Sequence, residues 1–153
     1  MTIAEMAPPR RRHGTVGDRL LDVRGLQTSF HTTDGVVRAV TGVDFHVNRG
    51  EVMGLVGESG CGKSVTSLSI LRLIAPPGRI EAGEVMFDGR DLLKLREREM
   101  RHLRGDRISM IFQQPTSSLN PVYDVGMQIG EVLELHRAMK RRDARRGAAE
   151  VVA

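Results

Sequence analysis

One glycine-rich run constrains the fold of this chain more than any other feature: Gly57-Glu58-Ser59-Gly60-Cys61-Gly62-Lys63-Ser64. Residues 53–56, directly before it, are apolar or glycine and are typical of a fully buried strand. After it, apolar side chains recur at helical spacing at Val65, Leu68 and Leu71, until a pair of prolines ends the pattern. A strand that enters a glycine-rich loop and a helix that leaves it predict a phosphate-binding P-loop.

Each part of this loop has a role in holding phosphate. Glycines let backbone N–H groups and the helix N-terminus point at phosphate oxygens. Lys63 places a cation between the terminal phosphates, and the hydroxyl of Ser64 is a hard oxygen that suits Mg²⁺. The alternative is a glycine-rich turn without a ligand, which the flanking strand and helix argue against. The loop by itself predicts only a P-loop NTPase, a class that includes GTPases, kinases and helicases.

Strand and helix patterns alternate along the rest of the chain. Residues 20–47 predict an antiparallel hairpin, turned by Thr32-Thr33-Asp34-Gly35 and including an alternating strand at 43–47. Further along we expect a strand at 84–87, a charged helix at 92–104 with a Glu97–Arg101 pair, a buried strand at 108–112 and a helix at 127–135. The sequence therefore predicts an α/β fold whose N-terminal part is an antiparallel β subdomain.

The distribution of charge argues against a nucleic-acid partner. The formal net charge is +4, but residues 137–146 carry +5 and residues 1–13 carry +2, which leaves −3 for the middle of the chain. A nucleic-acid binder would carry basic residues on its folded core, so we expect no nucleic acid. No apolar run reaches the roughly 18 residues that a membrane span needs. Any membrane role is therefore expected to be peripheral.

Three other features of the sequence carry no site of their own. Residues 1–17 are polar and irregular and are expected to be a disordered leader. Cys61 is the single cysteine, so no disulfide is expected, and we interpret it as a small side chain that fills a loop position. The five histidines lack the spacing of a metal cage.

A second informative segment is Ile111-Phe112-Gln113-Gln114-Pro115, followed by Thr116-Ser117-Ser118-Leu119-Asn120-Pro121. An amide directly after a buried strand could reach a ligand at the edge of an open α/β sheet. Two prolines and several short polar residues exclude a helix and imply a shaped loop. From the residues alone, an ordinary linker with a chance glutamine stays open.

Residues 20–136 resemble the N-terminal part of the ATP-binding subunit of ABC importers, in the oligopeptide/dipeptide or nickel subgroup. The motifs that carry the resemblance are the glycine-rich loop, Asp34-Gly35 with Ala39-Val40, Phe87-Asp88-Gly89, Arg104-Gly105, Met110-Ile111-Phe112-Gln113 and Ser118-Leu119-Asn120-Pro121. Gln114 stands where the family commonly has an acidic residue, and Thr116 where it commonly has methionine. Neither departure falls on a phosphate-binding position.

The resemblance implies roles for individual residues. Gln113 is expected to be the Q-loop glutamine, which contacts Mg²⁺ and the attacking water, so Lys63 and Gln113 are the catalytic candidates and Ser64 and Gln113 the metal ligands. ATP is expected to contact the loop together with Val65. Phe30 is the candidate for stacking on adenine, with a plain core aromatic as the alternative.

The resemblance also implies partners. It predicts transmembrane permease subunits of an importer, a second ATP-binding subunit in a homo- or heterodimer, and peripheral association with the cytoplasmic face of the cell membrane through the permease. The loop that ends at Pro121 is expected to face the permease.

The family's signature Leu-Ser-Gly-Gly-Gln and its Walker B strand with a terminal Asp-Glu do not occur in the 153 residues. We therefore expect residues 18–153 to be the N-terminal part of an ABC ATP-binding domain, truncated before both motifs, which binds ATP but does not hydrolyse it by itself. The alternatives are a non-transport ABC ATPase, another P-loop NTPase, and a non-enzymatic nucleotide-binding remnant.

Overall fold

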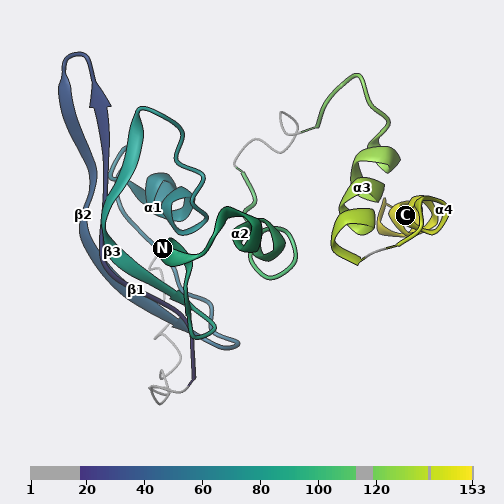
Figure 1. Cartoon of the computed structure of the whole chain (residues 1–153), viewed down its shortest axis with the longest axis horizontal. Helices are drawn as coiled ribbons and strands as arrows, with labels where there is room; N and C mark the ends of the chain where they lie inside the picture. The colour runs from purple at the N-terminus through teal and green to yellow at the C-terminus, as the bar shows by residue number, and fades with distance from the viewer. Residues whose placement is uncertain (1–17, 113–118, 138, 153) are drawn as a thin grey trace, which may run out of the picture. The chain divides into compact units, whose positions relative to one another are not determined.

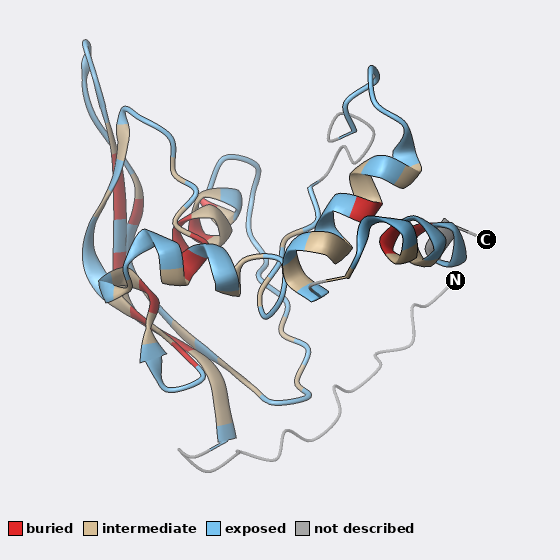
Figure 2. Cartoon of the chain, turned by 45° about the vertical axis from the view of Figure 1, so that its right-hand side comes forward, coloured by how far each residue is buried: buried red, intermediate tan, exposed pale blue. Residues whose placement is uncertain are grey.

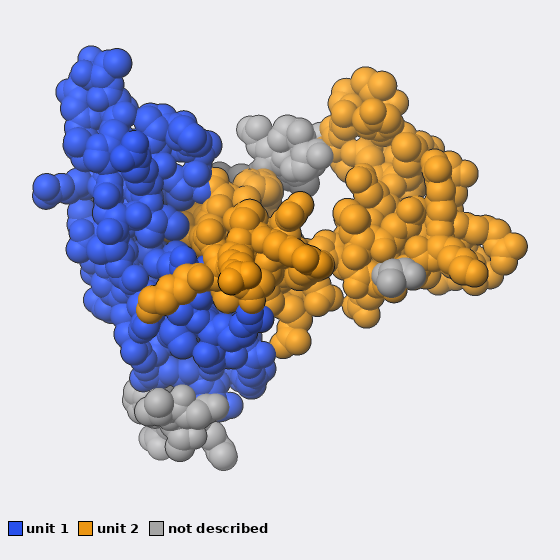
Figure 3. Space-filling view, in the orientation of Figure 1, with its two compact units in different colours: residues 1–66, 74–93 blue, residues 67–73, 94–153 orange. Residues whose placement is uncertain are grey.

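A computed structural model describes residues 18–112, 119–137 and 139–152 of the chain. The chain forms two compact units, one of residues 1–66 and 74–93 and the other of residues 67–73 and 94–153 (Figure 3). The expected leader at residues 1–17 lies outside the described residues. Within the described ranges, no helix combines the length and the apolar content that crossing a membrane requires.

The first unit is built on one four-stranded antiparallel sheet with the order β2-β1-β3-β4 (Figure 1). Its strands are β1 (Arg19–Thr32), β2 (Gly35–Asn48), β3 (Gly78–Phe87) and β4 (Arg90–Asp91). The predicted hairpin is confirmed, and residues 43–47 are the end of β2 rather than a separate strand. β3 begins earlier than the predicted 84–87 because its first half also pairs with β1.

Buried apolar residues of the three long strands and of the turn after β4 form the core of this unit. The buried positions of the ribbon are red in Figure 2. Val23, Leu26, Val40, Val85, Phe87 and Leu92 are all buried. The register of β1 shifts against both neighbours near Gly25. Gly83 of β3 lies opposite this bulge at φ +114°, where an added Cβ would lie 2.6 Å from the Cα of Leu26. Only glycine allows the two backbones to approach this closely.

The helix predicted after the glycine-rich loop is α1 (Lys63–Ile70). It ends earlier than the sequence pattern indicates, because Arg72 turns into the left-handed region at φ +53°. That conformation typically ends a helix.

The two predicted buried strands at 53–56 and 108–112 are wrong. Residues 51–58 form no strand, and Val52 and Val56 are 96% and 92% exposed. The second segment makes one isolated bridge, between Arg104 and Ile108, and Ile111 is 91% exposed. A buried parallel strand needs hydrogen-bonding neighbours on both sides and cover on both faces. Within the described part of the chain neither segment has them.

The charged helix predicted at 92–104 is two elements. A 3-10 turn, η2 (Leu92–Lys94), precedes α2 (Glu97–Leu103). The predicted Glu97–Arg101 pair is replaced by contacts of Glu97 with Arg104 at 2.6 Å and with Arg72 at 3.6 Å. The hydrogen bond from the Arg104 guanidinium holds the pKa of the Glu97 carboxyl below its usual value.

Arg104 joins the end of α2 to the segment that follows α1, within the second unit. Its Nε donates to the carbonyl of Leu71 at 2.7 Å, and a terminal nitrogen donates to the carbonyl of Arg72 at 3.0 Å. The last carbonyls of a helix have no intrahelical donors and carry partial negative charge. Arg104 therefore supplies both the missing donors and a compensating cation.

The second unit also contains a helical hairpin of α3 (Val125–Arg137) and α4 (Arg141–Val152). The first confirms the helix predicted at 127–135, and the second occupies the basic tail. Small residues line their contact: Gly130, Ala144 and Ala148 are buried, and an added Cβ on Gly147 would lie 3.2 Å from a methyl group of Leu133. The two helix backbones are therefore close together.

Replacing Arg104 by alanine removes the donors to Leu71 and Arg72, so Arg104→Ala is expected to lower the free energy of unfolding by about 2 kcal/mol. Arg104→Lys keeps the charge but loses the planar fork and should restore at most about half of this loss. Arg101→Ala, at an exposed position of the same helix, serves as control and should cost under about 0.5 kcal/mol. Urea unfolding followed by circular dichroism measures all three, and equal losses for Arg101 and Arg104 would contradict the assignment.

Candidate functional site

The glycine-rich loop is the site with the clearest chemistry. A turn closes inside it, where the N–H of Cys61 donates to the carbonyl of Glu58 at 3.3 Å. Helix α1 then begins at Lys63, and both the N–H and the hydroxyl of Thr66 bond to the carbonyl of Gly62, at 2.8 and 3.0 Å. The predicted loop-to-helix junction is therefore present.

Gly62 packs the loop against the sheet. Its φ is +90°, and an added Cβ would lie 2.3 Å from the carbonyl oxygen of Ala39 and 3.7 Å from a methyl group of Val40. A side chain at this position would collide with the backbone of β2. The pair Ala39-Val40 and the loop, which are separate motifs in the sequence, therefore touch in the first unit.

Lys63 crosses the loop from the first turn of α1. Its ammonium donates to the carbonyls of Gly57 and Glu58 at 2.7 and 2.6 Å, and lies 3.4 Å from the sulfur of Cys61. The first turn of α1 holds no acidic residue, so the positive end of the helix dipole adds to the lysine charge. Backbone N–H groups at the start of a helix and two sources of positive charge suit an anionic ligand.

The other predicted loop residues are mostly open to solvent. Glu58, Ser59, Gly60, Cys61 and Ser64 are exposed, and Val65 is half-buried in α1. The Ser64 hydroxyl in the first turn of the helix is a hard oxygen that fits Mg²⁺. Among the described residues, no group of three or more histidine, cysteine or acidic side chains could hold a metal ion by itself.

Phe30 lies in β1 and is half-buried. An added Cβ on Gly78 would lie 2.7 Å from the ring of Phe30 and 2.5 Å from a methyl group of Ile74, so the ring packs over the start of β3. Its role as the adenine platform stays a prediction.

The candidate Gln113 and the neighbouring residues 114–118 lie outside the described residues. The described part of the chain resumes at residue 119, and the residues that follow are held by the side chain of Gln128 in α3. Sequence reasoning missed this role of Gln128. The side-chain amide of Gln128 accepts from the N–H of Asn120 at 2.9 Å and donates to the carbonyls of Asn120 and Tyr123 at 3.1 and 3.0 Å. No local pattern signals this contact, because it joins residues across a loop.

Comparisons with known proteins agree with this geometry. Residues 40–152 match the family described as ABC transporter. The chain is 51% identical over 144 residues to the probable peptide ABC transporter ATP-binding protein y4tR of Sinorhizobium fredii, covering 94% of this chain and 43% of the relative. It is 50% identical over 135 residues to the oligopeptide transport ATP-binding protein OppD of Bacillus subtilis, covering 88% of this chain and 38% of the relative.

Solved structures give the same fold. A dimeric post-hydrolysis state of the ATP-binding cassette MJ0796 bound to ADP and Pi has a TM-score of 0.72 at 24% identity, over 85% of this chain and 54% of that one. This likeness supports the predicted ABC-type P-loop core with its antiparallel β subdomain. The chain spans well under half the length of the two curated relatives. Together the matched residues and the relatives establish that the chain belongs to the ABC transporter family.

Proposed function

We propose that this chain is the ATP-binding part of an ABC importer subunit and that, in the whole protein, ATP hydrolysis drives the uptake of peptides. The observation that carries the proposal is the loop of residues 57–64 at the start of α1, with Lys63 held across it. The names of the two curated relatives support peptides as the cargo, and neither of these proteins is named for nickel.

Each loop residue has a task in ATP binding. Backbone N–H groups from Gly57 to Ser64 surround the phosphates, and Lys63 exchanges its two carbonyl contacts for phosphate oxygens. The hydroxyl of Ser64 would hold Mg²⁺, which would neutralise phosphate charge. Val65 lines the site from the first turn of α1, and Phe30 stacks on adenine. Gln113 would serve as a further Mg²⁺ ligand and would orient the attacking water.

Partners follow from the same proposal. Transmembrane permease subunits receive the conformational change, and a second ATP-binding subunit pairs with this one. The dimeric solved structures of similar fold support the pairing. The protein then lies at the cytoplasmic face of the membrane, held there by the permease.

Lys63→Ala is expected to weaken ATP binding by at least about tenfold, since it removes a charge-assisted contact to phosphate worth about 1.4 kcal/mol or more. Lys140→Ala, which removes an exposed lysine elsewhere, should leave the affinity unchanged. Titration calorimetry with Mg²⁺ and ATP measures both. A folded wild-type chain that fails to bind ATP would overturn the proposed function.

Gly62→Ala is expected to weaken ATP binding more than Gly60→Ala does. Both residues have positive φ, so both substitutions strain the backbone by about 1–2 kcal/mol, but only the alanine at 62 collides with the Ala39 carbonyl. The collision moves the loop away from β2. Nucleotide titration with a circular dichroism check of folding compares them, and equal losses would show that the contact with β2 does not shape the loop.

The 153-residue chain is expected to bind ATP without turning it over, because its sequence contains neither the glutamate that serves as general base at the end of Walker B nor the signature motif that each subunit offers across the dimer. Phosphate release from the purified chain tests this. Turnover that disappears in Lys63→Ala would contradict the role assigned to the missing base.

A further inference from the structure

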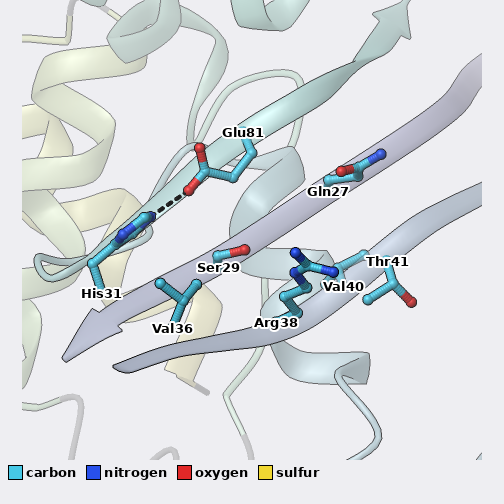
Figure 4. A pocket seen from close by; sticks show the side chains of 8 residues that line it. All are labelled: Gln27, Ser29, His31, Val36, Arg38, Val40, Thr41 and Glu81. Carbon is cyan, nitrogen blue, oxygen red and sulfur yellow. Dashed lines mark hydrogen bonds and ion pairs between the residues drawn. The ribbon is translucent and has the colours of Figure 1, made fainter. Parts of the chain in front are cut away.

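An open pocket of the first unit lies on a face of its sheet, and nothing in the proposed function uses it (Figure 4). Its volume is about 600 Å³, within the range of sites that hold small molecules. The strands β1, β2 and β3 all contribute to it. Its lining residues are Gln27, Ser29, His31, Val36, Arg38, Val40, Thr41 and Glu81.

This pocket lies on the opposite face of β1 from Phe30. Side chains alternate along a strand, so Gln27, Ser29 and His31 share one face and Thr28 and Phe30 share the other. Thr28 is fully buried, and the Phe30 ring packs over Gly78 on that other side. The pocket is therefore separate from the position at which Phe30 would stack on adenine.

Two arginines lie opposite one serine across the sheet, and one of them, Arg38, lines this pocket. The register pairs Ser29 with Arg38 of β2 and also with Arg79 of β3. Residues directly opposite each other in antiparallel strands project from the same face, with Cβ atoms about 5 Å apart. Arg38, Ser29 and Arg79 therefore form one row on this face of the sheet. Arg38 and Ser29 line the pocket, and Arg79 is the next residue of the row, beyond the pocket lining.

Among the described residues, no hydrogen bond to the Ser29 hydroxyl and no ion pair of Arg38 or Arg79 is seen. Ser29 is only 6% exposed, and its hydroxyl lines the pocket without a recorded hydrogen bond. Arg38 and Arg79 are both exposed. Neither forms an ion pair within the described part of the chain. The one carboxylate that lines the pocket, Glu81, is hydrogen-bonded to Nε2 of His31 at 2.5 Å. Among the described residues, Oδ1 of Asn48 is the one buried side-chain polar atom without a partner, so the Ser29 hydroxyl is open to the pocket, where a ligand can replace solvent as its partner.

We propose that the row of Arg38, Ser29 and Arg79 binds the carboxylate or phosphate group of a small molecule. Guanidinium groups present planar pairs of N–H donors that match the oxygens of either group, and Arg38 and Arg79 are the strand neighbours of Ser29 on its two sides. The hydroxyl of Ser29, the most buried residue of the row, donates to the same group, and the side chains of Gln27 and Thr41 in the pocket lining offer further donors. The remaining volume accommodates the body of the molecule beside Val36.

Heteronuclear NMR titration of the whole 153-residue chain tests the proposal. Inorganic phosphate and acetate are the two probes, used at constant ionic strength in a Lys63→Ala background that weakens competing binding at the glycine-rich loop. At least one probe should give saturable shifts at the backbone amides of Ser29, Arg38 and Arg79. Saturation by phosphate alone assigns a phosphate ligand, and saturation by acetate alone assigns a carboxylate.

Charge-matched variants separate this site from general attraction to a basic protein. Arg38→Gln and Arg79→Gln should each weaken binding by at least about tenfold, and Ser29→Ala by several-fold. Arg145→Gln removes an equal charge from an exposed position of α4 and should change affinity by less than about twofold. Chemical-shift changes that rise linearly with the concentration of both probes, without saturation, would overturn the proposal. An equal loss of affinity in Arg145→Gln would overturn it as well.

Discussion

The hydrogen bonding of β1 along both of its edges holds the first unit together. β2 pairs with one edge and β3 with the other, although the glycine-rich loop, α1 and its following turn separate those strands in sequence. Because β3 must return to β1, the intervening loop and the start of α1 are brought back to the sheet, where Gly62 meets the carbonyl of Ala39. The candidate nucleotide loop and the polar pocket both depend on this central strand.

The features that could be predicted from the sequence are those encoded by neighbouring residues. The first hairpin and α1 each have a local turn, cap or periodic signal, and the structure contains both. The strands predicted at 53–56 and 108–112 depend on partners that a local pattern cannot show. An apolar run indicates that a segment favours burial, but a strand also needs a neighbouring strand to pair with, and no described strand pairs with residues 51–58.

The candidate site divides in the same way. The spacing of glycines, Lys63 and Ser64 is a local signal, so the loop could be found from the sequence. The contacts of Arg104 with Leu71 and of Gln128 with Asn120 depend on tertiary structure, and the row of Arg38, Ser29 and Arg79 depends on strand register. A single bulge shifts register by one residue and moves a side chain to the other face. These groupings could therefore be recognised only once the sheet was known.

Any ligand of the loop has to compete with the two hydrogen bonds that Lys63 donates to backbone carbonyls. An incoming group must replace hydrogen bonds of 2.7 and 2.6 Å to Gly57 and Glu58, so only the surplus over those bonds contributes to affinity. A lone phosphate offers little more than the carbonyls already do, whereas adjoining phosphates concentrate several negative charges near the same ammonium. Under the proposed function, we therefore expect the loop to discriminate by charge density and to favour nucleoside di- and triphosphates over monophosphates before any contact with the base is made.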